Sequence, residues 1–308
     1  MAERIQDTKR DYDGADEQSV KGGCDTQAER TLVIGDMHCK EEPILERVDA
    51  AIEQLGCGRI VFCGDYVDEW HSNLLTMRDA LDALRTWVRK RRADGLTVDL
   101  VTGNHDMQYL LRETGPGTHA PLFDEVAHLL DELNVRAATT VGNTLVTHAG
   151  VTRSWATDCL DLAEGTDAQT IARQLNSLLD HGQKISLRML AMAGAGRGGY
   201  ELPGPLWADR SELAHDPLPG LDQIVGHTPV ESIDLWNIPA EDGVRTGARL
   251  VFCDTFSLKS NLSPIGDGSM LLVEGTGVRA VTDEELGLTP WPTTIWDWMT
   301  IHVLPFLG

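Results

Sequence analysis

The stretch TLVIGDMH, residues 31–38, joins a short apolar run to a glycine, a carboxylate and an imidazole. The same arrangement recurs at RIVFCGDYVD (59–68), VDLVTGNHD (98–106), TLVTHAG (144–150) and QIVGHT (223–228). Each run is short and rich in β-branched residues, which favours a buried strand. Five predicted strands therefore deliver polar side chains at their carboxyl ends, which is the edge where open α/β sheets assemble their sites.

Helical spacing separates the first three runs. The apolar residues that show it are Ile44, Val48, Ala51 and Leu55, which follow Pro43, and then Met77, Leu81, Leu84 and Val88. Alternation of strands with helices is typical of a parallel sheet. From about Thr144 onward the strands, which include RLVFC (249–253) and SMLLV (269–273), lack regular intervening helices. We therefore predict an α/β fold whose second half is more antiparallel or mixed.

The chain divides into three predicted parts. Residues 1–29 are highly charged and lack apolar periodicity, which indicates a disordered or loosely attached arm. Residues 30–286 form the main domain, with a mostly helical insertion at 152–205 that is either a lid or specificity cap or a purely structural excursion. Within it, Thr166 and Gln169 match a capping box ahead of a helix.

Residues 287–308 form a tryptophan-rich tail that contains Trp291, Trp296 and Trp298. We expect this tail to pack on the domain's own core. A subunit contact or a substrate wall is the alternative, because exposed aromatic side chains favour interfaces.

Composition restricts the class of protein. The 308 residues are 42% hydrophobic and 24% charged, as in a globular chain, and the net charge is -22. This charge opposes binding to nucleic acid or to an anionic membrane, so we expect neither as a partner. No run approaches the roughly 18 apolar residues of a spanning helix, and the first 29 residues do not resemble a secretion signal. We predict a soluble, cytoplasmic protein.

The six cysteines form no CxxC pair, so neither a zinc ribbon nor a redox dithiol is indicated and free thiols are expected. Four of the ten histidines fall in the polar loops, and we interpret the rest as structural or surface residues: His71, His119, His128, His181, His215 and His302. A single Asp-x-His or Gly-Asn-His motif is weak evidence for a functional site, because such residues usually cap turns. The coincidence of five loops is what indicates a site.

The chemistry of the loops is that of a metal site. In Asp36-x-His38 the alternate side chains of an extended segment point the same way, so both can reach one ion. Carboxylate, imidazole and amide ligands together suit Mn²⁺, Fe, Zn²⁺ or Mg²⁺ better than copper(I) or an iron–sulfur cluster.

The ordered motifs GDMHC, GDYVDEW, GNHD, THAG and GHTP resemble those of the calcineurin-like metallophosphoesterases, most closely the prokaryotic branch of the phosphoprotein phosphatases. LWADR (206–210) and CDT (253–255) resemble downstream segments of that branch, so the resemblance spans Thr31 to about Val273. It implies a two-sheet mixed β-sandwich flanked by helices, in four αββα layers.

The resemblance also assigns residues to two divalent metal ions, with Mn²⁺ expected first and Fe, Zn²⁺ or Mg²⁺ as alternatives. It implies one site made of Asp36, His38 and Asp65, and a second made of Asp65, Asn104, His148 and His227, with Asp65 bridging. Two cations about 3.5–4 Å apart share a hydroxide and lower its pKa. His105 matches the family's general acid and Asp68 the residue that orients it, while Asp106 is expected to support its loop.

Two positions depart from the family pattern. Glu69 stands where eukaryotic-type protein phosphatases carry a phosphate-binding Arg, and Cys39 stands where Gly usually follows the first His. A carboxylate repels phosphate, so another cation is needed. Arg188, Arg197 and Arg210 are the candidates, and the sequence does not choose among them.

These features predict a dinuclear metallophosphoesterase that hydrolyses phosphomonoesters by attack of a metal-bound hydroxide, with His105 as acid. The expected substrate is a phosphorylated small molecule or a phosphoprotein, in the latter case on Ser or Thr. A dinucleoside polyphosphate hydrolase or phosphodiesterase is the enzymatic alternative. Glu69 and Cys39 motivate an alternative of another class, a catalytically weak, metal-stabilised binding protein.

Overall fold

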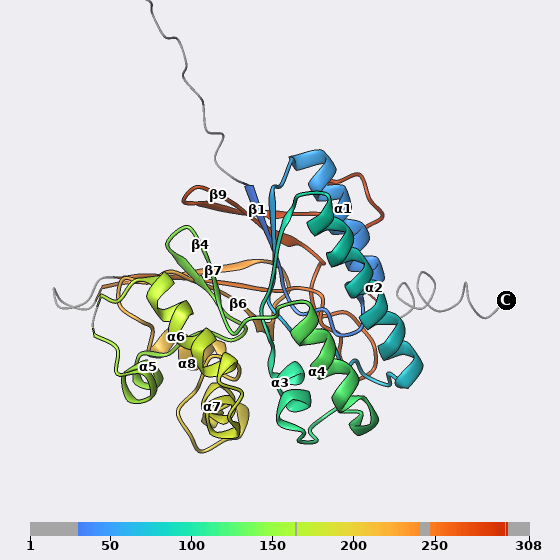
Figure 1. Ribbon diagram of the computed structural model, residues 1–308. Helices are drawn as coiled ribbons and strands as arrows, with labels where there is room; N and C mark the ends of the chain where they lie inside the picture. Colours follow the sequence, from blue (N-terminus) through green and yellow to red (C-terminus); the bar gives the residue numbers. More distant parts are fainter. Residues whose placement is uncertain (1–29, 164, 241–246, 293, 295–308) are drawn as a thin grey trace, which may run out of the picture.

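Two five-stranded sheets form the centre of the structure, a computed structural model that describes residues 30–163, 165–240, 247–292 and 294 (Figure 1). Both sheets are mixed, and helices flank them, which confirms the predicted two-sheet α/β fold. The predicted arm (1–29), Trp296 and Trp298 lie outside the described residues.

The first sheet has the order β10-β9-β1-β2-β3. Its strands are β1 (Arg30–Ile34), β2 (Arg59–Phe62), β3 (Thr97–Leu100), β9 (Met270–Glu274) and β10 (Gly277–Val281). The first three are parallel, and the pairs Ile34–Phe62 and Phe62–Leu100 are in register. Because the three strands end level with one another, the loops that follow them meet at one edge of the sheet.

The second sheet has the order β4-β5-β6-β8-β7. Its strands are β4 (Thr139–Val141), β5 (Thr144–Val146), β6 (Gln223–Pro229), β7 (Asp234–Ile238) and β8 (Ala248–Asp254). β5, β6 and β8 are parallel, whereas β4 and β7 are antiparallel to their neighbours. The register of β6 shifts between Val225 and Pro229, at the point where His227 adopts a φ of 63°.

Eight α-helices and two short 3₁₀ helices, η1 (Ala120–Leu122) and η2 (Ala195–Arg197), are found in the described part of the chain. The α-helices are α1 (Glu41–Leu55), α2 (Leu74–Ala93), α3 (Asn104–Leu111), α4 (Phe123–Glu132), α5 (Arg153–Leu160), α6 (Ala168–Asp180), α7 (Lys184–Leu190) and α8 (Arg210–His215). Figure 1 shows α1 to α4 on one side of the sheets and α5 to α8 on the other.

Alternation along the strands produces the layers, because successive side chains point to opposite faces of a sheet. In β1, Leu32 and Ile34 pack with the apolar stripes of α1 and α2, whereas Val33 packs against Val146 and Ile224 of the other sheet. On the far side, Leu145 joins the cluster formed by α5, α6 and α7. The order is therefore helix, sheet, sheet, helix.

All seven predicted strands are present, but three strands were missed: β4, β7 and β10. Each is antiparallel to a strand that was predicted, and each is short or partly exposed, so its apolar signal is weak. The predicted capping box is also wrong. The N-cap of α6 is Asp167, whose side chain accepts the N–H of Thr170, and it replaces Thr166 in that role.

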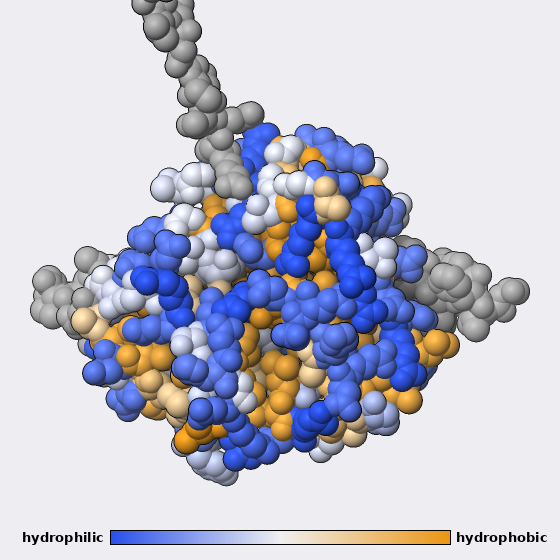
Figure 2. All heavy atoms as spheres, viewed as in Figure 1, coloured by the Kyte–Doolittle hydropathy of each residue, from blue (hydrophilic) through white to orange (hydrophobic). Residues whose placement is uncertain are grey.

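The described cysteines confirm the expectation of free thiols: Cys39, Cys57, Cys63, Cys159 and Cys253. No helix within the described ranges combines the length and apolarity that crossing a bilayer requires. Figure 2 shows a mainly hydrophilic face, with apolar residues gathered in its lower half, over the helices drawn there in Figure 1.

Trp291, from the predicted tail, belongs to the main core and is 2% exposed. Its ring lies edge-on to Phe256 at 4.9 Å, and the Arg47 guanidinium lies 4.8 Å from its centroid. Arg47 is itself held by the buried carboxylate of Asp283 at 3.0 Å. The segment that follows the last strand is thus anchored through one large side chain.

We predict that Trp291→Ala lowers the free energy of unfolding by about 3–5 kcal/mol, because it leaves a large cavity in the core. Urea unfolding followed by circular dichroism measures this. Tyr200→Ala is the matched control, since Tyr200 is fully exposed, and it should change stability by less than about 0.5 kcal/mol. Equal stability of the two variants would contradict the anchoring role of Trp291.

Candidate metal centre

The five polar loops of the sequence converge at one edge of the two sheets. The buried side chains there are Asp36, Asp65, Asn104, His148 and His227, while His38 and His105 are partly exposed. All of these except His148 line a cavity of about 490 Å³, and His148 contacts it from behind through Asn104 and His227. The structure therefore brings together every side chain that the sequence assigned to metal binding and acid catalysis.

A tight crossing of two loops sets the position of Asp65. Gly64 has a φ of 107°, and a Cβ built there would lie 2.5 Å from the backbone nitrogen of Gly103, so only glycine fits. The buried Asp106 carboxylate accepts the N–H groups of Gly103, Asp65 and Tyr66 at 2.7, 2.8 and 3.0 Å. Asp106 thus joins the loop after β2 to the start of α3, as the sequence indicated.

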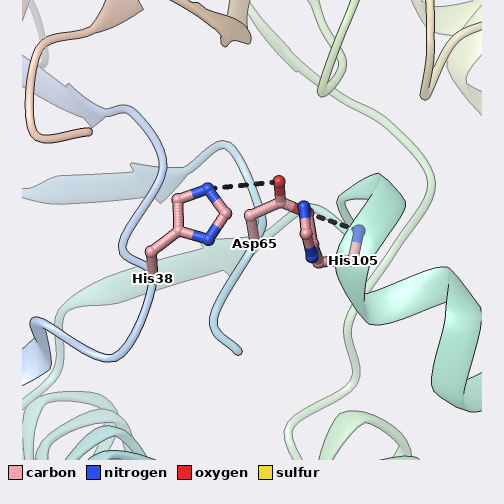
Figure 3. A group of neighbouring side chains, drawn as sticks. All are labelled: His38, Asp65 and His105. Atoms are coloured by element: carbon pink, nitrogen blue, oxygen red, sulfur yellow. Dashed lines mark hydrogen bonds and ion pairs between the residues drawn. The ribbon is translucent and has the colours of Figure 1, made fainter. Parts of the chain in front are cut away.

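Asp65 is shared by two clusters of ligand atoms. One consists of His38, Asp65 and His105, and the other of Asp36, Asp65 and His148, with the atoms of each within 4.8 Å of one another. Figure 3 shows the first cluster, in which His38 Nε2 lies 3.6 Å from Asp65 Oδ2. The backbone N–H of His105 donates to Asp65 Oδ1 at 2.9 Å. His38 Nε2 also lies 3.8 Å from Asp36 Oδ2.

Hydrogen bonds on the outer side of two imidazoles fix which nitrogen faces the site. His38 Nδ1 contacts the carbonyl oxygens of Val67 and Asp68, both at 3.1 Å, and His148 Nδ1 contacts that of Cys63 at 2.8 Å. A carbonyl only accepts, so each Nδ1 carries the proton and each Nε2 presents a lone pair. A hydrogen bond from the outer ring nitrogen to a carbonyl is typical of metal-binding histidines.

The inner cluster contains more acceptors than donors. His148 Nε2 lies 2.8 Å from Asn104 Oδ1, 3.1 Å from His227 Nδ1 and 3.5 Å from Asp65 Oδ2. His227 Nε2 is buried and has no hydrogen-bond partner. Lone pairs that converge in this way repel one another unless a cation lies among them, so the residues present fit a bound metal.

Buried charge points to the same conclusion. Burial, with repulsion from Asp254 and Asp65, raises the pKa of Asp36 well above its usual value, and burial raises that of Asp65 to about 6. Burial lowers the pKa of His38 and His227 and brings that of His148 to about 4. Neutral imidazoles beside crowded carboxyls form a set of ligands that a divalent cation would stabilise.

His105 differs from these three histidines because its pKa is raised and theirs are lowered. Burial by itself lowers its pKa, but the charges of Asp65 and Asp68 and the hydrogen bond to Asp68 raise it to about 9. The distance from His105 Nδ1 to Asp68 Oδ2 is 3.1 Å, and the other Asp68 oxygen accepts the Tyr109 hydroxyl at 2.6 Å. Asp68 is fixed on both oxygens and favours the protonated form of the His105 imidazole at the cavity.

Glu69, at the position where eukaryotic-type protein phosphatases were expected to carry an arginine, is neutralised by a residue that the sequence did not single out. Lys40 is buried and forms an ion pair with Glu69, and its ammonium also donates to the His38 carbonyl at 3.1 Å. Its place two residues after His38 is the sequence signal that could have identified Lys40 as part of the site. The Glu69 carboxylate therefore does not face the cavity as an unpaired negative charge.

The three candidate arginines are separated by the structure. Arg197 lines the metal cavity, where it donates to Thr228 Oγ1 at 2.5 Å and pairs with Asp209 at 3.2 Å. Arg188 is 60% exposed and pairs with Glu113. Arg210 lies over the Trp236 ring, 3.7 Å from Asp234. Of the three, only Arg197 is brought to the site.

Three aromatic residues near the site were not assigned to it from the sequence. Trp70 and Trp207 line the cavity, and the Trp207 ring meets the edge of His227 at 5.6 Å. Tyr109 holds Asp68 from α3, one turn after His105. The sequence signal that could have found them is their closeness to the motifs. Trp70 ends GDYVDEW, Trp207 lies in LWADR, and Tyr109 lies four residues after His105, on the same face of a helix.

Glu41, the first residue of α1, lies behind the site. It is completely buried, and neither carboxyl oxygen has a hydrogen-bond partner. Burial raises its pKa from 4.5 to about 8. The folded protein therefore retains a proton on Glu41 that the unfolded chain releases near pH 4.5.

The family model for calcineurin-like phosphoesterases matches residues 29–234. A mutant of a cold-active protein tyrosine phosphatase is 16% identical, with a TM-score of 0.51 over 87% of this chain and 81% of that one. A protein serine/threonine phosphatase from Saccharomyces cerevisiae is 16% identical, with a TM-score of 0.45 over 81% and 74%. At 16% identity, the first of these likenesses shows similarity of fold alone. No curated protein matches the sequence.

We predict that Glu41→Gln abolishes one component of the pH dependence of stability. Because the folded-state pKa exceeds the unfolded one, the contribution of Glu41 falls as pH rises from 4.5 to about 8 and is constant outside that window. The variant cannot release this proton, so its stability relative to the wild type should increase by up to about 1.4 kcal/mol per pH unit.

Urea unfolding at pH 5.5, 7.0 and 8.5, with EDTA present, measures this difference. The neighbouring exposed Glu42 provides the control, since Glu42→Gln should give a curve parallel to that of the wild type. A Glu41→Gln curve that also runs parallel would show that Glu41 does not hold a proton in the folded state.

Proposed function

The chain belongs to the calcineurin-like phosphoesterases and is a phosphoric ester hydrolase, and we propose that it is a dinuclear-metal phosphomonoesterase. The observation that carries this proposal is the position of Asp65 between two clusters of ligand atoms. A carboxylate shared in this way is the ligand expected of a two-metal site. The similarity of LWADR and CDT to downstream motifs supports the prokaryotic branch of the phosphoprotein phosphatases.

The proposed ligands are Asp36, His38 and Asp65 for one cation, and Asp65, Asn104, His148 and His227 for the other. Mn²⁺ is the preferred ion, with Fe, Zn²⁺ or Mg²⁺ as alternatives, because the set mixes hard oxygen with imidazole nitrogen. When bound, the two cations lower the pKa of a water molecule and offset the negative charge of the phosphate.

His105 is proposed to protonate the departing oxygen of the ester. Its Nδ1 is hydrogen-bonded to Asp68, so Nε2 is the nitrogen left to carry the transferred proton. Asp68 stabilises the imidazolium and sets the orientation of the ring, and Tyr109 fixes Asp68. The hydrogen bond to Asp68 and the charge of Asp68 raise the pKa of His105 and so favour the protonated acid.

Arg197 is proposed to bind the phosphate oxygens in place of the missing family arginine. It lines the cavity that the ligands line, and its pairing with Thr228 and Asp209 holds the guanidinium in place. A planar guanidinium suits phosphate better than an ammonium does. Because Arg197 lies in the 152–205 segment, this assignment supports the interpretation of the insertion as a specificity cap.

The proposed substrate is a phosphomonoester on a small molecule or a phosphoprotein. Hydrolysis of p-nitrophenyl phosphate, its bis-ester and diadenosine tetraphosphate, each with Mn²⁺, separates the monoesterase from the diesterase and polyphosphate alternatives. Two bound metals with no hydrolysis of any of them would favour a metal-stabilised binding protein. Cytoplasmic location stays a prediction from the lack of a secretion signal or a long apolar run in the sequence, and the lack of nucleic-acid or membrane partners stays a prediction from the net charge of -22.

We predict that His105→Asn lowers kcat by roughly 10²–10⁴-fold, the contribution of a general acid, while two metals stay bound. The loss should be greater for phenyl phosphate than for p-nitrophenyl phosphate, because a poorer leaving group needs the proton more. Steady-state kinetics and elemental analysis measure both effects. Loss of one metal would instead make His105 a ligand, together with His38 and Asp65.

We predict that Arg197→Ala lowers kcat/KM for p-nitrophenyl phosphate by roughly 10- to 100-fold, the value of a charge-assisted hydrogen bond. It should weaken inhibition by inorganic phosphate to a similar extent, and Arg197→Lys should recover part of the loss. Arg188→Ala, the exposed control, should stay within about twofold of the wild type. Equal effects of the two alanine variants would exclude Arg197 as the phosphate ligand.

A further inference from the structure

An exposed indole is fixed at the rim of the metal cavity. Trp70 lines the cavity, yet its side chain is 50% exposed. Its Nε1–H donates to the Leu258 carbonyl at 2.9 Å, and its backbone N–H donates to Glu69 Oε1 at 2.7 Å. The next residue, His71, contacts the Ser260 carbonyl at 3.0 Å. The ring is thus held in one position by its own polar atom and by both neighbours.

Glu69 contributes to this placement. One of its oxygens is paired with Lys40 and the other accepts the Trp70 N–H. Both oxygens are therefore occupied by the chain itself. The residue that replaces the family's arginine acts to position the tryptophan and takes no part in phosphate binding.

Trp70 differs from the other exposed large apolar residues of the described ranges in its position at the cavity. Five large apolar side chains are exposed in the described ranges: Trp70, Leu75, Ile185, Tyr200 and Leu235. Of these, Trp70 alone lines the metal cavity. A rigid, half-exposed ring costs little entropy when it binds a partner, so it is suited to recognition.

Polar and apolar side chains share the lining of the cavity. The polar part consists of the proposed metal ligands other than His148, with Asp68, Glu69, His71, His105, Arg197 and Ser257, and the apolar part consists of Trp70, Pro116, Trp207, Pro229 and Leu258. Its volume of about 490 Å³ lies within the range of sites for whole small molecules. Space therefore exists beyond the phosphate for the group that carries it, and that space is bounded by two indole rings.

We propose that this site selects phosphate esters that carry a planar aromatic ring close to the phosphate, with Trp70 contacting the ring. The inference rests on the proposed phosphoesterase function and adds the substrate class. Aromatic pairs gain affinity beyond area burial alone, whereas an alkyl phosphate lacks a ring to make this contact. An aryl phosphate such as phosphotyrosine and a nucleotide with its base both present that chemistry.

The test uses inhibitors, because phosphonates bind without being hydrolysed. Phenylphosphonate should inhibit p-nitrophenyl phosphate hydrolysis about three- to tenfold better than methylphosphonate, as an added aromatic contact predicts. Trp70→Ala should reduce that ratio to near one, and Trp70→Phe should retain most of it. Leu75→Ala is the matched control, since Leu75 is exposed but outside the cavity, and it should leave the ratio unchanged.

Substrate pairs then identify the source of the ring. The effect of Trp70→Ala on kcat/KM is compared for phenyl phosphate against methyl phosphate, and for adenosine monophosphate against ribose 5-phosphate. Taking the variant-to-wild-type ratio for each substrate cancels differences in leaving group. A selective loss within the first pair assigns an aryl phosphate, and a selective loss within the second assigns a nucleotide.

Equal inhibition by the two phosphonates, or losses that are the same with and without a ring, would overturn this inference and leave the phosphoesterase function in place. If p-nitrophenyl phosphate and every other ester are inert with two metals bound, the proposed function fails, and the selectivity fails with it. The two failures are thereby distinguished.

Discussion

The crowding of carboxyl and imidazole groups in the interior is the constraint on which this structure depends. Asp36, Asp65, His148 and His227 lie in the interior, where their carboxyls repel one another and their imidazoles face other acceptors. Such an arrangement is costly by itself, and a fold retains it only where the gain lies in function. Cations would convert the same geometry into a stable one, because each acceptor would then face a positive charge. Binding of cations at the site would therefore also stabilise the residues around it.

The sheets supply the precision that this arrangement requires. β1, β2 and β3 end in register, so three loops begin at the same height, and β5 and β6 bring the other two from the facing sheet. The backbone N–H groups of Met37 and His38 donate to the Asp65 carbonyl at 3.2 and 2.7 Å, which joins the loops after β1 and β2. Asp106 joins the loops after β2 and β3 by accepting three N–H groups, and Gly64 and Gly103 allow these two loops to touch.

The sequence predicted what depends on buried apolar runs and local order. Strand cores such as RIVF and the loops after them could be read from residue types, because burial on both faces leaves continuous hydrophobic runs. The edge strands β4, β7 and β10 were not predicted, because they are short or half exposed and their apolar pattern is weak. The Lys40–Glu69 pair, the choice of Arg197 among three arginines and the placement of Trp70 are contacts between distant segments. No spacing along the chain specifies such contacts, so only the folded structure could provide them.

Glu69 shows how a single departure from a family pattern becomes intelligible in three dimensions. Taken alone, a carboxylate at a phosphate site argues against catalysis. In the structure its charge is paired with that of Lys40, its second oxygen accepts the Trp70 backbone N–H, and Arg197 of the insertion lines the same cavity. With Arg197 as the proposed phosphate ligand, the cation of this site comes from a separate segment, and the Glu69 position supports Trp70 at the rim of the cavity. On that proposal the site keeps a cation for the phosphate and differs at the side that contacts the rest of the ester.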